Sequence, residues 1–260
     1  MEARLDGKVA IVTGATQGIG AAIAGTLAAS GVSGLLITGR DPERGEAMAR
    51  RLSGLGPKAV FVAADLAEED APARIVSQCL DVFGRIDALA NAAGLTDRAG
   101  FLDADAAIWE KLFAVNARAP FFLMQGAIAA MKSRGGGGAI VNILSINAHC
   151  GAPDLAVYSA TKGALATLTK NAANAHKGDR IRVNGINMGW ADTPGERRMQ
   201  GETLGLGAGW IDAANAAVPF GRLLAAQEVA NLAVFLLSDA AGPMTGSVID
   251  QEQWVVGANN

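Results

Sequence analysis

A tyrosine and a lysine one helical turn apart lie in the segment LAVYSATKGAL (155–165). Tyr158 is the only tyrosine among 260 residues, and Lys162 follows it four positions later. On a helix, residues four apart share a face, with Cβ atoms ~5–6 Å apart. A phenol has a pKa near ~10, and a neighbouring ammonium lowers that pKa because it favours the phenolate. The pair predicts a general acid or base for a carbonyl and alcohol couple, with a buried tyrosine beside an exposed lysine as the alternative.

A glycine-rich turn near the start of the chain predicts a site for a diphosphate. The apolar run KVAIVT (8–13) leads into TGATQGIG, where Gly14, Gly18 and Gly20 have the spacing G-x-x-x-G-x-G. Glycine permits a sharp turn and lets backbone N–H groups approach a phosphate at a helix N-terminus. Because the turn joins a predicted strand to a predicted helix, we expect a dinucleotide here. A tight turn without a ligand is the alternative.

The end of the second predicted strand bears on the choice between NAD and NADP. An acidic residue at this position would accept hydrogen bonds from the adenosine ribose and favour NAD. This chain has Gly39 and Arg40 instead, and an arginine can pair with a 2′-phosphate. The sequence therefore favours NADP(H) over NAD(H), with a solvated arginine at a strand end as the alternative.

Short apolar runs alternate with helical patterns along the chain. We expect strands at 8–13, 34–39, 58–63, 85–90, 138–144, 180–186 and 246–250, and helices near 18–30, 42–54, 69–83, 104–133, 157–176 and 227–239. The strands are almost continuously apolar, as they are when helices cover both faces of a sheet. The pattern predicts an α/β fold, a Rossmann-like doubly wound parallel sheet of about seven strands in a single domain, 1–260. The glycine-containing segment 191–218 is predicted to be a substrate lid, with a plain surface excursion as the alternative.

Composition and charge exclude several classes of protein. Half of the residues are hydrophobic and 18% are charged, which favours a packed core over disorder. A net charge of -3 without a basic stripe gives no footprint for nucleic acid. No signal peptide is recognisable and no segment approaches the ~20 apolar residues of a membrane helix. Two distant cysteines, Cys79 and Cys150, favour a reduced, cytoplasmic protein, and no metal is expected.

Taken together, these motifs resemble the short-chain dehydrogenase/reductase family. TGATQGIG, NAAG (91–94), a serine after the fifth strand and YSATK follow one another in the family's order over nearly the whole chain. In that family the serine lies thirteen residues before the tyrosine, which is Ser145 here. The resemblance implies that Tyr158 exchanges a proton with the substrate oxygen and that Ser145 donates to the substrate carbonyl. It also implies that Lys162 lowers the pKa of Tyr158 and holds the nicotinamide ribose.

The resemblance implies a fourth catalytic residue, Asn116, in the segment VNARAPF. Four positions later, Pro120 has no N–H and cannot close the helical hydrogen bond to the carbonyl of Asn116. That carbonyl would be free to hold a water, which in the family relays protons from the lysine to bulk solvent. A kink without a function is the alternative.

Further cofactor contacts follow from the resemblance. Asp65 matches a residue that contacts adenine, Asn91 begins a motif that borders the cofactor, and Thr193 matches a threonine at the carboxamide. The full set of expected cofactor-binding residues is Gly14, Thr16, Gln17, Gly18, Ile19, Gly20, Arg40, Asp65, Leu66, Asn91, Ala92, Gly94, Tyr158, Lys162 and Thr193.

Three segments depart from the family pattern. Ala92 replaces a usual asparagine, Met188-Gly189-Trp190 replaces a usual Pro-Gly, and 250–254 (DQEQW) replaces an aspartate-glycine-glycine run. The expected substrate pocket consists of Leu95, Ser145, Asn147, His149, Met188 and Trp190. For the histidine, a side chain satisfied within its loop is an equal alternative.

The sequence predicts an NAD(P)-dependent oxidoreductase that interconverts a ketone or aldehyde and an alcohol. A 3-oxoacyl thioester reductase and an NAD-dependent sugar or polyol dehydrogenase are alternatives, and a cofactor-binding regulator without turnover is an alternative of another class. The expected partner is a small molecule, with no nucleic acid and no membrane. The apolar helices at 104–133 and 157–176 could be buried against other copies, and since the family is typically tetrameric we expect a homotetramer.

Overall fold

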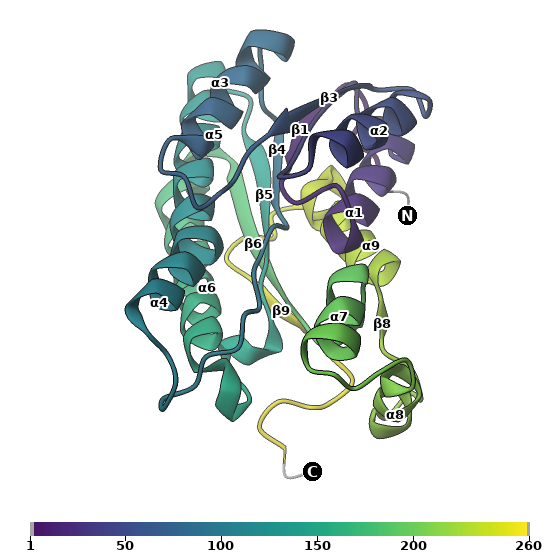
Figure 1. The fold of residues 1–260 in the computed structure, drawn as a ribbon. Coiled ribbons are helices and arrows are strands. Elements are labelled where there is room, and N and C mark those ends of the chain that lie inside the picture. The colour runs from purple at the N-terminus through teal and green to yellow at the C-terminus, as the bar shows by residue number, and fades with distance from the viewer. Residues whose placement is uncertain (1–2, 259–260) are drawn as a thin grey trace.

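Seven parallel strands form the central sheet of the computed structural model, which describes residues 3–258 (Figure 1). The strands are β1 (Val9–Val12), β2 (Gly34–Gly39), β3 (Lys58–Ala63), β4 (Ala88–Asn91), β5 (Gly138–Ile143), β6 (Ile181–Met188) and β9 (Val248–Gln251). Their order is β3-β2-β1-β4-β5-β6-β9, and all neighbours are parallel. The predicted fold class is confirmed. The strand order reverses between β1 and β4, which is where open α/β sheets bind their ligands.

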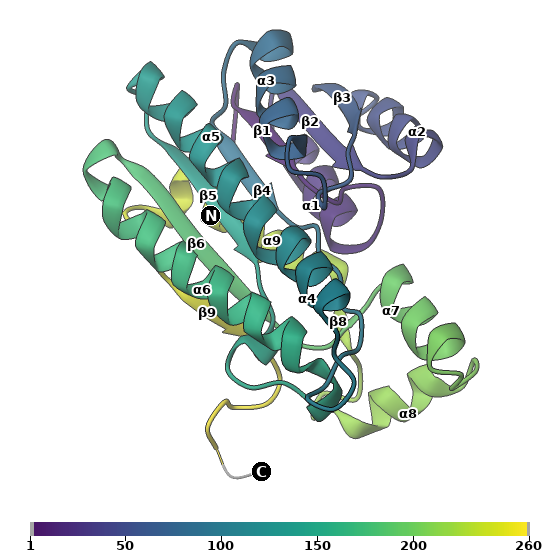
Figure 2. The same cartoon turned by 60° about the vertical axis from the view of Figure 1, so that its left-hand side comes forward.

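Helices cover both faces of the sheet, as Figures 1 and 2 show. One layer contains α1 (Gly18–Ala29), α2 (Pro42–Ser53) and α9 (Ala226–Leu237), and the other contains α3 (Ala71–Phe83), α5 (Ala119–Arg134) and α6 (Ala156–His176).

Alternate residues of one strand supply the two resulting cores. In β1, Ala10 and Val12 pack with α1 and α9, whereas Val9 and Ile11 pack with α3 and α5. Successive side chains of a strand point to opposite faces, so a strand covered on both sides is apolar at every position. This packing explains the unbroken apolar runs in the sequence.

The long helix expected at 104–133 is interrupted. It consists of α4 (Ala106–Phe113), a π-helical turn (Ala114–Arg118) and α5, which has Pro120 in its first turn. Because proline lacks an N–H, a wider turn just before it accommodates the missing hydrogen bond.

Among the described residues, the stretch Ala106–Arg134 is the one helix long and apolar enough, by length and composition, to cross a membrane. The sequence-based expectation was that no segment approaches ~20 apolar residues, whereas this helix qualifies by length and composition. Of its most apolar window, 61% is buried inside the protein, which is typical of a core helix.

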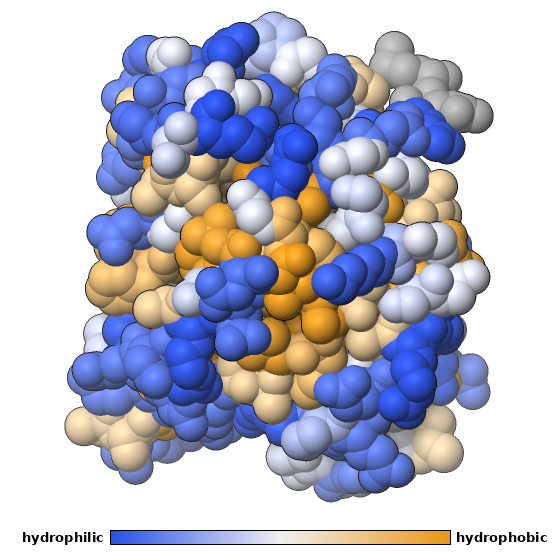
Figure 3. All heavy atoms as spheres, turned by 90° about the horizontal axis from the view of Figure 1, so that it is seen from above, coloured by the Kyte–Doolittle hydropathy of each residue, from blue (hydrophilic) through white to orange (hydrophobic). Residues whose placement is uncertain are grey.

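The segment 191–218 is more ordered than its glycines indicated. It contains β7 (Ala191–Asp192), α7 (Pro194–Arg198), a π-helical turn (Met199–Thr203) and α8 (Trp210–Ala217), and β7 pairs with β8 (Leu224–Ala225). Trp210 is buried in a small apolar cluster with Ala214 and Leu223. Figure 2 shows α7 and α8 standing apart from the two helix layers. Figure 3 shows the end of the molecule away from them, where hydrophilic residues surround an apolar area.

Candidate active site

A cleft of about 840 Å³ lies at the carboxyl ends of the strands on both sides of the β1/β4 reversal. This volume is in the upper part of the ~300–1,000 Å³ range of ligand pockets. Of the residues predicted from the sequence, the cleft is lined by Gly14, Thr16, Gln17, Gly18, Ile19, Gly20, Arg40, Asp65, Leu66, Ala92, Gly94, Leu95, Ser145, Asn147, Tyr158, Lys162, Met188, Trp190 and Thr193. Three predicted residues do not line it: Asn91, Asn116 and His149.

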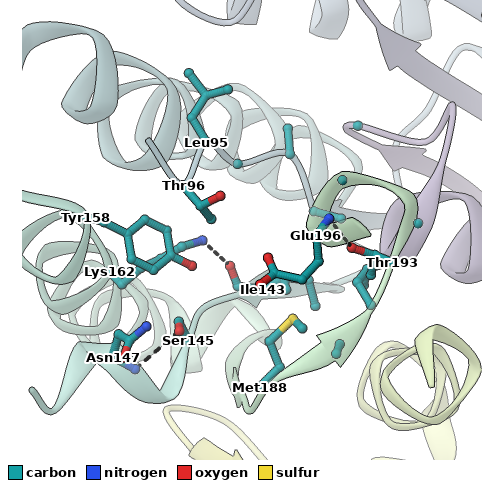
Figure 4. Close-up of a pocket in the computed structure, with 18 of the residues that line it drawn as sticks. Leu95, Thr96, Ile143, Ser145, Asn147, Tyr158, Lys162, Met188, Thr193 and Glu196 are labelled. Atoms are coloured by element: carbon teal, nitrogen blue, oxygen red, sulfur yellow. Dashed lines mark hydrogen bonds between the residues drawn. The ribbon is translucent and has the colours of Figure 1, made fainter. Parts of the chain in front are cut away.

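Ser145, Tyr158 and Lys162 come together at the centre of the cleft (Figure 4). Ser145 follows β5, and its Oγ accepts a hydrogen bond from the backbone N–H of Asn147 at 3.2 Å. Tyr158 and Lys162 lie one turn apart on α6, and both are buried. The Nζ of Lys162 donates to the carbonyl oxygen of Ile143 at 2.8 Å and lies 5.7 Å from the centroid of the Tyr158 ring.

Burial governs the protonation of both α6 side chains. It raises the pKa of Tyr158 to about 12, although a hydrogen bond with Ser145 opposes this rise. The charges of Glu196 and Arg98 act in opposite directions, with Glu196 raising the pKa of Tyr158 and Arg98 lowering it. Burial also lowers the pKa of Lys162 to about 8. Both groups are therefore biased toward their neutral forms.

The role expected for Lys162 stays a prediction. The expectation was that its ammonium lowers the pKa of Tyr158, and in the protein alone that pKa is shifted by burial, by Ser145, and by the charges of Glu196 and Arg98. The low-polarity surroundings destabilise the ammonium as well as the phenolate, and the ammonium donates to the Ile143 carbonyl.

Asn116 lies behind the cleft and positions its wall. Its Nδ2 donates to the carbonyl of Leu95 at 2.9 Å and to Thr161 Oγ1 at 3.1 Å, and its Oδ1 accepts from the N–H of Leu95 at 2.9 Å. A Cβ built on Gly94 would lie 3.5 Å from both Asn116 Oδ1 and Lys162 Nζ, so these two groups border the same small space. The water-holding role of the Asn116 carbonyl stays a prediction.

The other two predicted residues outside the cleft have partners elsewhere. Asn91 is buried between β4 and β5, and its Nδ2 donates to Asn142 Oδ1 at 2.8 Å. Its side chain joins two strands, and the expected contact with the cofactor stays a prediction. His149 Nε2 lies 3.0 Å from Asp250 Oδ1 and 3.1 Å from Asn187 Nδ2, which holds the ring at the end of β9 and β6.

The glycine-rich turn has a shape that fits a dinucleotide. Gly14 and Gly18 have φ angles of +64° and +57°, a region that favours glycine. A Cβ on Gly14 would lie 2.8 Å from the Cα of Ala93, and one on Gly20 would collide with the carbonyl oxygen of Gly14. Gln17 begins α1 without a side-chain hydrogen bond to the helix N–H groups, which leaves them for phosphate oxygens.

Arginines from three segments lie near this turn. Arg40 is exposed and lines the cleft at the end of β2. Gln17 Oε1 accepts hydrogen bonds from Arg44 Nη1 at 3.1 Å and Arg198 Nη2 at 3.3 Å. Neither residue is part of TGATQGIG, because Arg44 belongs to α2 and Arg198 to α7.

Several lining residues were not predicted from the sequence. They are Thr96, Arg98, Asp154, Glu196, Gln200, Glu252, Gln253 and Trp254. Three of them belong to 251–254, where the departure from the family pattern was the available signal. No motif or spacing in the sequence pointed to Glu196. Figure 4 shows its carboxylate extending from α7 toward the side of the cleft that holds Tyr158.

The arrangement supports proton transfer at a carbonyl or alcohol oxygen. A buried phenol with a raised pKa keeps its proton at neutral pH, and a serine hydroxyl beside it can hydrogen-bond the same oxygen. The cradle for a dinucleotide continues into this pocket within one cleft.

Comparison with known proteins gives consistent matches. Residues 8–203 match the model of the short chain dehydrogenase family. A cis-4-hydroxycyclohexanecarboxylate dehydrogenase of Sinomonas cyclohexanicum is 35% identical over 243 residues, covering 93% of this chain and 94% of the relative. An NADP-dependent (R)-specific alcohol dehydrogenase of Lentilactobacillus kefiri is 33% identical over 249 residues, covering 95% and 96%.

Among solved structures, an L-sorbose reductase of Gluconobacter frateurii in complex with NADPH and L-sorbose has a TM-score of 0.93. It is 30% identical in sequence, and the match covers 100% of both chains.

Proposed function

The chain belongs to the short chain dehydrogenase family, and on that premise we propose that it uses NADP(H) with Tyr158 as its proton carrier. It is an oxidoreductase that interconverts a carbonyl compound and an alcohol with a nicotinamide cofactor. The observation that carries the proposal is the meeting of Ser145, Tyr158 and Lys162 in the cleft that also contains the glycine-rich turn.

Each side chain has a separate part in the proposed reaction. The hydroxyl of Ser145 donates to the substrate oxygen, and Tyr158 transfers its proton to the same oxygen during reduction. The bound nicotinamide supplies or accepts the hydride. With a pKa of about 12, Tyr158 is protonated at neutral pH and ready to act as the acid. Lys162, with a pKa of about 8, can exchange protons near neutral pH and is the next carrier toward Asn116.

The preference for NADP(H) is supported by the arginines at the adenosine end of the cleft. Arg40 is available to a 2′-phosphate, and Arg44 and Arg198 add positive charge around Gln17. One relative is NADP-dependent and one similar structure contains NADPH, which agrees with this preference. Asp41 pairs with Arg44 and offsets part of the positive charge, so the proposal depends mainly on Arg40.

The test of the proposed function is turnover by the purified chain. NADPH consumption with a panel of ketones and aldehydes, and NADPH formation with the corresponding alcohols, should both be measurable. If the wild-type protein binds NADPH but turns over no substrate in either direction, the site proposal is wrong and a regulatory role is favoured.

Several wider proposals accompany this one. Residues 1–260 act as one catalytic domain, with 191–218 as the substrate lid, in a cytoplasmic homotetramer. Exposed aromatic side chains on α4 and α5 support assembly, because Trp109, Phe121 and Phe122 are each more than a third exposed on helices expected to face a partner. Sedimentation of a monomer at micromolar concentration would contradict the tetramer.

A further inference from the structure

We infer that Glu196 selects an uncharged, polyhydroxylated substrate, a sugar-type ketone or the corresponding polyol, by accepting a hydrogen bond from one of its hydroxyls. The inference depends on the proposed function, because it specifies the substrate class of the same cleft. It adds to the serine, tyrosine and lysine a residue of the lid that acts on specificity.

One carboxylate oxygen of Glu196 accepts hydrogen bonds from the protein, and the other is available to a ligand. Its backbone N–H donates to Thr193 Oγ1 at 3.1 Å, which caps α7 and fixes the residue in the first turn. Its Oε1 accepts from Trp190 Nε1 at 2.8 Å and from Gln200 Nε2 at 2.7 Å. Within residues 3–258, no donor is bonded to its Oε2. A carboxylate fixed in this way presents one acceptor to a ligand.

Arg98, which also lines the cleft, offers an unused donor. Its Nε is buried and has no hydrogen-bond partner in the described part of the chain. The nearest acid, Asp154, lies 3.5 Å away at Oδ2 and forms an ion pair without a hydrogen bond to this atom. Since buried polar groups are nearly always paired, an unpaired donor among lining residues indicates a ligand acceptor.

A hydroxyl-rich substrate matches this combination of groups. Each alcohol group is both a donor and an acceptor, so a polyol can donate to Glu196 while it accepts from Arg98. Thr96, Asn147 and Gln200 line the same cleft and also provide donors and acceptors. A ketone with only alkyl substituents would leave these polar groups unpaired, which is costly.

The charge of the pocket argues against an anionic substrate. Glu196 and Glu252 both line the cleft, and neither has an ion-pair partner within 4.0 Å among residues 3–258. The guanidinium of Arg98 is already paired with Asp154. A sugar acid or a phosphate-bearing thioester would bring its negative charge near two carboxylates, and like charges at close range are unfavourable. This also disfavours the 3-oxoacyl thioester reductase.

Glu196→Gln is the variant that tests the inference, since it keeps the size and an acceptor for Trp190 and Gln200 but removes the charge. Glu202→Gln is the matched control, because Glu202 is an exposed glutamate of the same lid that does not line the cleft. Steady-state rates with NADPH are compared for ketohexoses and for hexan-2-one. Losing a hydrogen bond to a charged group should lower kcat/KM for the preferred ketohexose about 10- to 100-fold, and for hexan-2-one less than about 3-fold.

A second readout separates selection from a structural role. Because the charge of Glu196 raises the pKa of Tyr158, Glu196→Gln should move the pH profile of polyol oxidation to lower pH. The other polar and charged groups near the Tyr158 phenol are unchanged in this variant; they are Ser145, Lys162, Arg98 and Asp154. NADPH affinity and the melting temperature should match those of wild type. Equal losses with both substrates and weaker NADPH binding would show that Glu196 only holds the lid.

The outcomes distinguish this inference from the proposed function. If wild type turns over no carbonyl compound at all, the proposed function fails. If wild type is active but prefers hexan-2-one, a sugar acid or an amino ketone to every ketohexose, only the inference is overturned. The same holds if Glu196→Gln leaves the preference unchanged.

Discussion

The two halves of the cleft recognise their ligands by different means. The cofactor half is built largely from backbone, with Gly14, Gly18 and Gly20 leaving room and N–H groups for phosphates. The substrate half is built from side chains of three distant segments, among them Arg98, Glu196 and Glu252. Backbone recognition needs glycines at fixed spacing in one short stretch, so it is visible in a sequence. Side-chain recognition across segments becomes visible only when the fold brings them together.

Tyr158 stands where the two halves meet, and its loss should have the largest effect. Tyr158→Phe removes the proton donor but keeps the ring, so kcat should fall about 10²- to 10⁴-fold, the range of general acid catalysis. NADPH binding, measured by fluorescence titration, should change little. Near-normal turnover by this variant would remove the phenol from the mechanism.

A change in the backbone-built half should act on cofactor binding instead. Gly14→Ala places a Cβ 2.8 Å from the Cα of Ala93 at a φ of +64°. We expect NADPH affinity to fall at least about 10-fold, and the free energy of unfolding to fall by about 1–2 kcal/mol from the left-handed backbone. Calorimetric titration and urea denaturation measure the two effects. Gly25→Ala, at a helix position with open space, is the control.

In the cofactor half, the proposed preference for NADPH depends on one side chain, that of Arg40. Arg40→Ala should weaken NADPH binding about 10-fold, the value of a charge-assisted hydrogen bond, and leave NADH binding nearly unchanged. Kd values for both cofactors test this. Arg50→Ala, an exposed arginine of α2 outside the cleft, provides the comparison. Equal weakening of NADPH and NADH would eliminate the phosphate pairing.

The smallest expected effect concerns stability and pH. Burial lowers the pKa of Lys162 to about 8, so between that pH and 10.5, the ordinary pKa of a lysine, the unfolded chain binds a proton that the folded chain lacks. Wild-type stability should therefore rise with pH across this window. Below pH 8, the free energy of unfolding of Lys162→Met should exceed that of wild type by about 1–2 kcal/mol. This figure allows for the loss of the hydrogen bond from Lys162 to the Ile143 carbonyl. The difference should disappear near pH ~10, where the lysine is neutral in the folded protein.

Melting temperatures of both proteins at the two pH values measure the difference. Lys170→Met, at an exposed position of α6, should show no such window. A pH-independent difference between Lys162→Met and wild type would mean that the lysine is charged in the folded protein throughout.

The fold was predictable because its signals are local and repeated. Apolar runs alternating with helical patterns indicated all seven strands of the sheet. The elements within 191–218 were not found, since β7 and α7 are too short to have a period. Their structure depends on tertiary contacts such as those of Trp210.

The positions of the predicted site residues follow the same division between local and distant signals. Motif residues in the turn and on α6 reached the cleft, because their neighbours in sequence determine their geometry. Asn91 did not, because strand residues alternate between faces and its side chain reaches Asn142 instead. The pKa of Tyr158 was also not deducible, because it depends on burial and on Glu196 and Arg98, which lie far away in sequence.

The π-helical turn at Ala114–Arg118 changes the direction in which the side chains after it point from the helix axis. One extra residue in a turn rotates everything after it by about 100° relative to an uninterrupted α-helix. The helix can therefore present Leu112 to one apolar cluster and Leu123 to another, while Asn116 turns inward between them. A single-residue deletion within the turn would convert it to regular helix and rotate either α4 or α5 out of its packing. The length of this segment is thus constrained as tightly as the identity of its asparagine.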